Sequence, residues 1–462
     1  MDLGFDTVGN ATVIVYDRGP LLVTDPWIDG PAYFGSWSLS HAIPPEQHAA
    51  IRSSPYVWFS HGHPDHLNGG SLPLFRDAQI LLPDHVGGRI ASTLEADGYR
   101  VQVLADRQWV PLSDRVRVQC VADPYQDAIL LIDVDGHLIV DANDCTDKGS
   151  AWLRRIVREF RSSFLLRLSG YGDADMINFF DESGQRITPP PLARKMAGHQ
   201  VGAAMAQAAD AFGVTHTVPF SSMHQYQRAD SVWANECKVN VDDYGVGFAS
   251  NRARLLPAFV RYDFTTDDCQ PLEPEPVPAA SIEPSVFGDD WSEELERDDV
   301  ALATEYFGAI ERLSSYLQFV NLRVGGKDNT ISLATKRFDR GVTFELPRHS
   351  LVEALRWRIF DDLLIGNFMK TTLHGQWPAT GLYPHFEPYV AKYADNGEAR
   401  TEAEIKEYLR AYRRRMEPWD YARSRFELAA SQAVRGLVRK DSRSYKTLER
   451  AFWYAKGRRT AR

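Results

Sequence analysis

Short apolar runs alternate with amphipathic stretches from the N-terminus to about Thr217. The runs have the length and the β-branched composition of strands, and Gly and Asp separate them. Apolar residues at helical spacing occur between the runs, at Trp152, Ile156 and Phe160 and again from Val201 to Phe212. We therefore predict sheets with helices on their outer faces. The expected strands are 12–16, 21–24, 56–59, 80–82, 116–121, 128–134 and 138–140.

One turn can be predicted in detail. Asp135 and Gly136 stand between two of the expected strands. A left-handed backbone is easy for Gly and tolerable for Asp, so this pair predicts a tight hairpin.

The pattern changes after Asp268. Residues 269–290 include prolines and acidic residues, which argue against a regular ladder and predict a solvated linker. Apolar residues at helical spacing follow at Leu302, Tyr306, Ile310, Leu313 and Leu317, and segments with strand-like composition occur at 330–334 and 342–346. We expect a first, larger domain at 1–268, the linker at 269–290 and a smaller α+β domain at 291–462.

Composition and charge narrow the class of protein. The chain has 462 residues, 44% of them hydrophobic and 25% charged, as in ordinary globular proteins. Its formal charge of −10 argues against a main task in coating nucleic acid or anionic lipid. The segment 440–462 is rich in Lys and Arg, and we interpret it as a solvated terminal helix, with a nucleic-acid or lipid contact as the alternative.

The cysteines and the N-terminus suggest a compartment. The four cysteines show no paired spacing, which is typical of reduced thiols. The N-terminus has no pattern of a secretory signal, and no apolar run approaches the ~18 residues that span a bilayer. We expect a cytoplasmic protein without a membrane partner; self-association stays open.

Residues that could bind metal ions lie directly after the apolar run 56–59. The sequence there reads SHGHPDH, so three of the thirteen histidines and one aspartate fall within six positions. His61 and His63 are two residues apart in a strand-end conformation, so both rings can share one cation. Asp65 and His66 follow on the turn and can address a second cation. Imidazole and carboxylate suit zinc, iron or manganese, and crowding them without a cation leaves desolvated polar atoms.

The HxHxDH motif after a strand resembles the metallo-β-lactamase superfamily, whose fold is an αββα sandwich with a dinuclear metal site. Within it the chain is most similar to CMP-N-acetylneuraminate hydroxylase and its relatives. The segments that carry this likeness are LLVTDPWIDGPAYFGSWSL at 21–39, WFSHGHPDHLN at 58–68, DAILLIDVDGHLIVDANDCT at 127–146, VPFSS at 218–222 and, more weakly, FDDLLIGNF at 360–368. The resemblance implies an α/β (α+β) fold, the sandwich followed by the smaller domain.

The resemblance also implies a ligand set for two divalent metal ions. His61 and His63 would hold the first ion, and Asp65 and His66 the second. Asp144 matches the aspartate that bridges both ions, and His224 the last histidine at the second ion. The alternatives are a helix cap for Asp144 and a polar loop residue for His224.

Two further aspartates belong to this comparison. Where the superfamily has a third histidine at the first ion, this chain has Asp123, just before the strand 128–134. An oxygen ligand there favours iron or manganese over zinc, and the alternative is a turn residue before Pro124. Asp25 resembles an aspartate that orients a ligand histidine.

The expected function is a dinuclear metal-dependent hydrolase acting on a small-molecule ester, lactone, amide or phosphoester through a metal-activated water, with Asp65 as catalytic residue. The alternative is a di-iron monooxygenase, an oxidoreductase, related to the hydroxylases. The Cys-x-His and Cys-x-x-His pairs of a Rieske cluster are missing from this sequence, so an oxygenase would need a separate ferredoxin and reductase. Iron or zinc is expected, with manganese as a further candidate.

Overall fold

The computed structural model of the chain describes residues 1–145, 150–169, 176–333, 338–378, 381–383, 385–419 and 422. The basic segment 440–462 lies outside the described residues. Of the helices within them, none has the length and apolar character needed to cross a bilayer.

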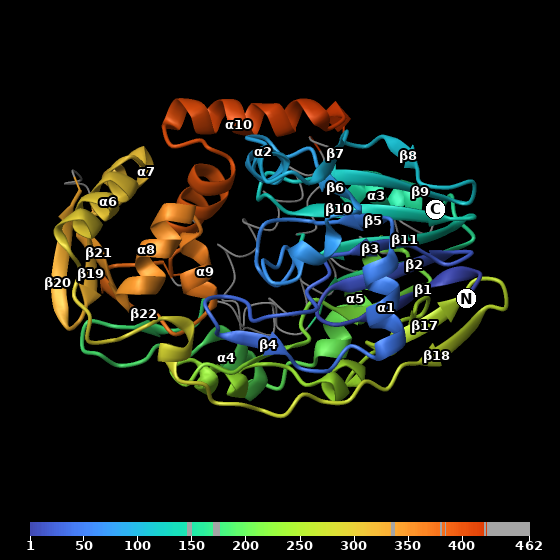
Figure 1. Cartoon of the computed structure of the whole chain (residues 1–462), viewed down its shortest axis with the longest axis horizontal. Coiled ribbons are helices and arrows are strands. Elements are labelled where there is room, and N and C mark those ends of the chain that lie inside the picture. The colour runs from blue at the N-terminus through green and yellow to red at the C-terminus, as the bar shows by residue number, and fades with distance from the viewer. Residues whose placement is uncertain are drawn as a thin grey trace.

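Two large sheets form the first part of the molecule, at the right of Figure 1. The first has the order β18 (Asp268–Pro271), β17 (Val260–Asp263), β1 (Leu3–Val8), β2 (Thr12–Asp17), β3 (Pro20–Thr24), β5 (Tyr56–Trp58), β6 (Gln79–Pro83), β7 (Arg100–Leu104). The second has the order β16 (Arg254–Leu255), β14 (His216–Phe220), β12 (Ser162–Leu168), β11 (His137–Asn143), β10 (Ala128–Val134), β9 (Val116–Ala122), β8 (Trp109–Pro111).

The sheets pack face to face. Phe5 and Val13 of the first sheet share one buried apolar cluster with Leu130 and Phe164 of the second. Burial of such side chains on both inner faces is the main favourable term that holds the sheets together.

Helices cover the two outer faces. The helices α1 (Pro45–Ser53) and α2 (Arg89–Ala96) bury Ile51 and Leu94 against the first sheet. The helices α3 (Ser150–Val157) and α5 (Val201–Phe212) bury Leu153 and Phe212 against the second. The predicted αββα sandwich is therefore confirmed.

The predicted hairpin is present as well. Val134 pairs with His137, which leaves Asp135 and Gly136 as the two turn residues. Both have a left-handed backbone, with φ of 50° and 86°, as a two-residue turn of type I′ requires.

A third sheet belongs to the part of the molecule that we call the C-terminal unit, at the left of Figure 1. Its order is β13 (Phe179–Phe180), β22 (Lys370–Gly375), β21 (Arg340–Glu345), β19 (Phe319–Val324), β20 (Lys327–Ser332). The unit also contains α6 (Arg297–Gly308), α7 (Glu311–Tyr316), α8 (Arg348–Trp357), α9 (Phe360–Ile365), the π-helix Pro388–Asn396 and α10 (Glu402–Arg415). This arrangement confirms a mixed α/β fold with a smaller α+β part.

Short elements complete the described chain. A two-stranded sheet joins β4 (Trp37–Leu39) to β15 (His224–Tyr226), and α4 (Pro190–Met196) lies below it in Figure 1. Single 3₁₀ turns occur at Leu72–Phe75, Val232–Glu236, Val241–Gly245 and Pro284–Phe287.

Two local expectations were wrong. The start of the proline-rich segment does join a ladder, because β18 pairs with β17 through Pro271, at the edge of the sheet where a missing N–H is tolerated. The apolar stripe 302–317 forms two helices rather than one, because Ile310 leaves the helical conformation with φ −92° and ψ 97°. The domain boundaries themselves remain a prediction.

Candidate metal centre

The candidate centre lies where parallel strands of both large sheets end. In the first sheet β3, β5 and β6 run parallel, and in the second β11, β12 and β14 do. The carboxyl ends of parallel strands meet at one edge of a sheet, which is where ligands commonly bind. Asp25 follows β3, His61 follows β5, Asp144 follows β11 and Ser221 follows β14.

The backbone turns sharply at these strand ends. Asp25, Asn143 and Ser221 have φ of 41°, 48° and 56°. Non-glycine residues seldom adopt this left-handed conformation, and such strain tends to collect at functional sites.

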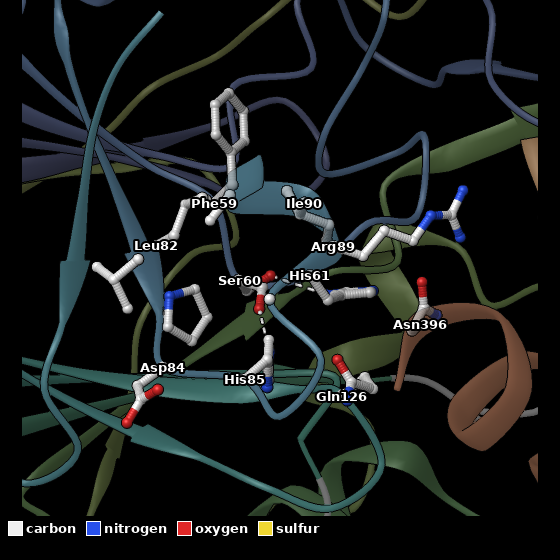
Figure 2. A pocket seen from close by; sticks show the side chains of 14 residues that line it. Phe59, Ser60, His61, Leu82, Asp84, His85, Arg89, Ile90, Gln126 and Asn396 are labelled. Carbon is white, nitrogen blue, oxygen red and sulfur yellow. Dashed lines mark hydrogen bonds between the residues drawn. The ribbon is translucent and has the colours of Figure 1, made fainter. Parts of the chain in front are cut away.

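A cavity adjoins His61 (Figure 2). Phe59, Leu82 and Ile90 supply apolar walls, and Gln126 and Asn396 supply polar groups. His85, which also lines the cavity, has its Nε2 3.3 Å from the backbone oxygen of Ser60. The space beside His61 could therefore take a small, mainly apolar group.

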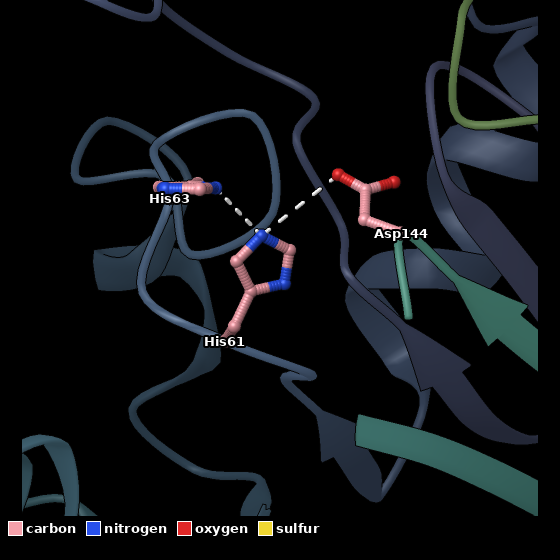
Figure 3. Close-up of side chains that lie close together, drawn as sticks. All are labelled: His61, His63 and Asp144. Atoms are coloured by element: carbon pink, nitrogen blue, oxygen red, sulfur yellow. Dashed lines mark hydrogen bonds and ion pairs between the residues drawn. The ribbon is translucent and has the colours of Figure 1, made fainter. Parts of the chain in front are cut away.

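Three of the predicted ligands converge (Figure 3). His61, His63 and Asp144 each offer one atom, and these atoms lie within 4.8 Å of one another. His61 Nε2 is 2.8 Å from His63 Nδ1 and 4.0 Å from Asp144 Oδ2.

His66 joins the same group from the other side. Its Nε2 is 3.4 Å from Asp144 Oδ2 and 3.3 Å from Asp65 Oδ2. Asp144 therefore lies between His61 and His66, a position from which one carboxylate can address two cations. Ser221 donates a hydrogen bond of 2.5 Å to the other oxygen of Asp144.

Asp65 is held on two sides. Tyr33 donates to its Oδ1 at 2.5 Å, and Asn10 donates to its Oδ2 at 2.9 Å. Burial raises the pKa of Asp65, but His66, His63 and the Tyr33 hydrogen bond outweigh it and hold the pKa well below its usual range. Asp65 is therefore an ionised carboxylate of fixed orientation.

Asp25 is fully buried and orients two of the histidines. It accepts hydrogen bonds of 2.7 Å from both the backbone N–H and the hydroxyl of Ser60, and Nδ1 of His66 lies 3.1 Å from its Oδ2. Because the Ser60 hydroxyl donates to Asp25, we assign the 2.9 Å contact between Ser60 Oγ and His61 Nδ1 to a proton on His61.

This network determines which ring nitrogens are free. With protons on Nδ1, His61 and His66 present their Nε2 lone pairs to Asp144. His63 Nε2 is 3.0 Å from Asp361 Oδ2, so its Nδ1 lone pair faces His61. Two lone pairs at 2.8 Å repel each other unless a proton or a cation lies between them.

The pKa values of two of the histidines are raised by nearby carboxylates, whereas burial and the neighbouring histidines lower the pKa of His61 well below its usual value. Burial lowers the pKa of His63, yet Asp361 and Asp362 outweigh it, and the pKa rises to about 9. Burial also lowers the pKa of His66, but the negative charges of Asp65, Asp144 and Asp25 outweigh it and raise this pKa well above its usual value. The donor set fits a divalent cation, which would take the place of these protons.

His224 lies at the start of β15, with its ring stacked on Trp37 at 3.4 Å between centroids. Among the described residues neither ring nitrogen has a hydrogen-bond partner. Burial and Lys238 lower its pKa to about 3, against the effect of Asp65. A buried neutral imidazole with two unpaired nitrogens suits a metal ligand.

Asp123 takes part in a turn. Its Oδ1 accepts hydrogen bonds from the backbone N–H of Tyr125 at 2.6 Å and of Asp127 at 3.3 Å, and Cys145 Sγ lies 3.6 Å from its Oδ2. Its role as a ligand stays a prediction.

Sequence reasoning missed the contribution of the C-terminal unit. Asp361 and Asp362, both buried, form a second convergent group with His63, their ligand atoms again within 4.8 Å. The signal was present in FDDLLIGNF, where two acidic residues open an otherwise apolar segment.

The fold and the site together define a two-sheet sandwich with a histidine- and carboxylate-rich centre at one edge. In sequence the chain is similar to cytidine monophosphate-N-acetylneuraminic acid hydroxylases. It is 30% identical to that of Asterias rubens over 160 residues, 33% of this chain and 24% of the relative. It is 28% identical to that of Danio rerio over 159 residues, 32% of this chain and 27% of the relative. The chain thus spans about a quarter of the length of these relatives.

No family model matches the sequence. Solved structures with some likeness include Igni18, a metallo-hydrolase from Ignicoccus hospitalis, with 13% identity, TM-score 0.35, and coverage of 57% of this chain and 99% of that one. CmlA, a diiron β-hydroxylase from Streptomyces venezuelae, has 13% identity, TM-score 0.34, and coverage of 59% and 54%.

Proposed function

We propose that this protein is a metal-dependent enzyme that hydrolyses a small-molecule ester, lactone, amide or phosphoester at a dinuclear centre. The observation that carries the proposal is the convergence of His61, His63 and Asp144 within 4.8 Å. His61, His63 and Asp144 would hold the first ion, and Asp65, His66, Asp144 and His224 the second. Bound divalent ions lower the pKa of water toward neutrality and polarise a substrate oxygen.

The surrounding residues supply orientation. Tyr33 and Asn10 fix the two oxygens of Asp65, so this ionised carboxylate can accept a hydrogen bond from the attacking water and orient it toward the substrate. Asp25 keeps the lone pairs of His61 and His66 aimed at the centre. The cavity lined by Phe59, Leu82 and Ile90 would receive the apolar part of the substrate.

The test is metal analysis followed by turnover. The isolated protein is expected to carry two ions per chain, and protein loaded with zinc, manganese or iron to hydrolyse at least one member of an ester and phosphodiester panel. His61→Ala should lower turnover by more than the roughly 100-fold that loss of an orienting partner costs. His349→Ala, an exposed histidine of the C-terminal unit, is the control. No turnover with any of the three metals would contradict the proposal.

A second candidate is a di-iron monooxygenase, favoured by the similarity to the hydroxylases. The same nitrogen and oxygen donors suit iron. This alternative expects two irons per chain and oxygen uptake when a ferredoxin and its reductase are added. Tight zinc binding without oxygen uptake would exclude the monooxygenase.

A further inference from the structure

His63 contacts a residue that lies outside the sandwich. His63 Nε2 lies 3.0 Å from Asp361 Oδ2, although the two residues are 298 positions apart in the chain. Asp361 belongs to α9, which lies on the side of the C-terminal unit that faces the sandwich (Figure 1). Both side chains are largely buried, with 14% of His63 and 4% of Asp361 exposed.

One buried carboxylate, Asp25, orients the other two histidines of the motif. It contacts His66 directly and His61 through the Ser60 hydroxyl. In each case a buried carboxylate holds the proton on one ring nitrogen and leaves the other nitrogen free toward the centre. Asp361 stands in the same relation to His63 as Asp25 does to His66.

We propose that Asp361 is a positioning residue of the metal centre, which the C-terminal unit supplies to the sandwich. It accepts the Nε2 proton of His63 and so aims Nδ1 at the space shared with His61 and Asp144. This inference rests on the metal centre of the proposed function and adds a residue that the HxHxDH motif does not contain.

The placement of Asp361 is secured by the segment that follows it. The Ser36 hydroxyl donates to the backbone oxygen of Gly366 at 2.5 Å, and Asn367 donates to the Tyr226 hydroxyl at 2.9 Å. Ser36 directly precedes β4 and Tyr226 ends β15, so these bonds fix the end of α9 to the two-stranded sheet that carries His224. The Arg228 guanidinium, fully buried, stacks on Phe368 at 3.9 Å.

A buried cation belongs to the same unit as Asp361. Lys392 lies on the π-helix Pro388–Asn396, is largely buried, and its charge acts on Asp361. The C-terminal unit therefore carries both the carboxylate that bonds His63 and a positive charge that favours this carboxylate.

The test compares Asp361→Ala and Asp361→Asn with the wild type. The zinc affinity of the full chain is measured by chelator competition, and the His63 ring protons by NMR of the zinc-loaded, ¹⁵N-histidine-labelled protein. We expect Asp361→Ala to weaken zinc binding by about 10- to 100-fold and to lose the slowly exchanging Nε2 proton signal of His63. Asp361→Asn keeps a side-chain oxygen as acceptor and should restore part of both readouts.

The control is Asp395→Asn, which removes another buried carboxylate of the same unit, bonded to Tyr306 rather than to a histidine of the centre. It should leave zinc affinity and the His63 signal unchanged. Unchanged zinc affinity in Asp361→Ala, or an equal loss in Asp395→Asn, would overturn the role of Asp361 while leaving the centre intact. A wild-type chain that binds no metal would overturn the centre and this inference together. Zinc binding without hydrolysis of any substrate would affect only the proposed reaction.

Discussion

At the scale of single residues, Asp25 has the largest share in ordering the centre. Its carboxylate accepts from Ser60 twice, from His66 and from Asn143, all of them buried. Removing one acceptor therefore leaves several buried donors without a partner, which costs far more than an average hydrogen bond contributes.

Asp25→Ala is accordingly expected to lower the free energy of unfolding by about 3 kcal/mol or more. Urea unfolding of the metal-free protein measures this, so the result does not depend on metal binding. Asp77→Ala, at an exposed position, should change it by less than about 0.5 kcal/mol. Equal effects of the two substitutions would contradict the central place of Asp25.

Single residues also show how much of the site can be predicted from the sequence. The motif residues His61, His63, Asp65 and His66 could be predicted because they lie within six positions, so local geometry alone brings them together. Asp144, which follows a strand of the other sheet, could be chosen only through the family resemblance. Asp361 stands out in FDDLLIGNF as an acidic residue at the start of an apolar segment, but the local pattern does not say which distant histidine it packs against.

At the scale of elements, most strands could be predicted because continuous apolar runs fill both faces of a buried sheet, as β10 does with seven buried residues. The helices α6 and α7 could not be separated in advance. Both bury apolar residues in one core, so the stripe continues through Ile310 although the helix does not.

The segment after α9 offers a test at this scale. Asn367 is fully buried with φ 58°, accepts from the Ile177 N–H at 2.8 Å and donates to Tyr226. Asn367→Ala loses these bonds and places alanine in a left-handed conformation, so we expect a loss of about 3 kcal/mol in unfolding free energy. Chemical denaturation measures it, with the exposed Asn251→Ala as control. A loss below about 1 kcal/mol would argue against a fixed α9.

At the scale of the whole molecule, α10 runs across the top of both parts in Figure 1. The Tyr408 hydroxyl donates to the backbone oxygen of Pro124 at 2.8 Å, and the Tyr412 hydroxyl accepts from the Val86 N–H at 3.1 Å. Both contacts reach loops of the sandwich, so α10 joins the C-terminal unit to the edge that carries the candidate centre.

Hydrogen exchange can detect this connection. Tyr412→Phe removes the acceptor of the Val86 amide, so exchange at Val86 should become faster while the buried strand residue Val57 stays unchanged. Tyr389→Phe, a partly buried tyrosine of the same unit, is the matched control. Unchanged exchange at Val86 would contradict a tight contact between α10 and this loop.

The bonds around Asp25 and Asn10 have a mechanical consequence. Asp25 follows β3 of the first sheet and accepts from Asn143 of the second, and Asn10, between β1 and β2, accepts from the Met223 N–H beyond β14. Two stacked sheets can ordinarily slide a little past each other, since apolar side chains give no directional resistance. Here the polar bridges resist such shear at the end of the stack that carries the histidines, so side chains contributed by the two sheets keep their relative positions there.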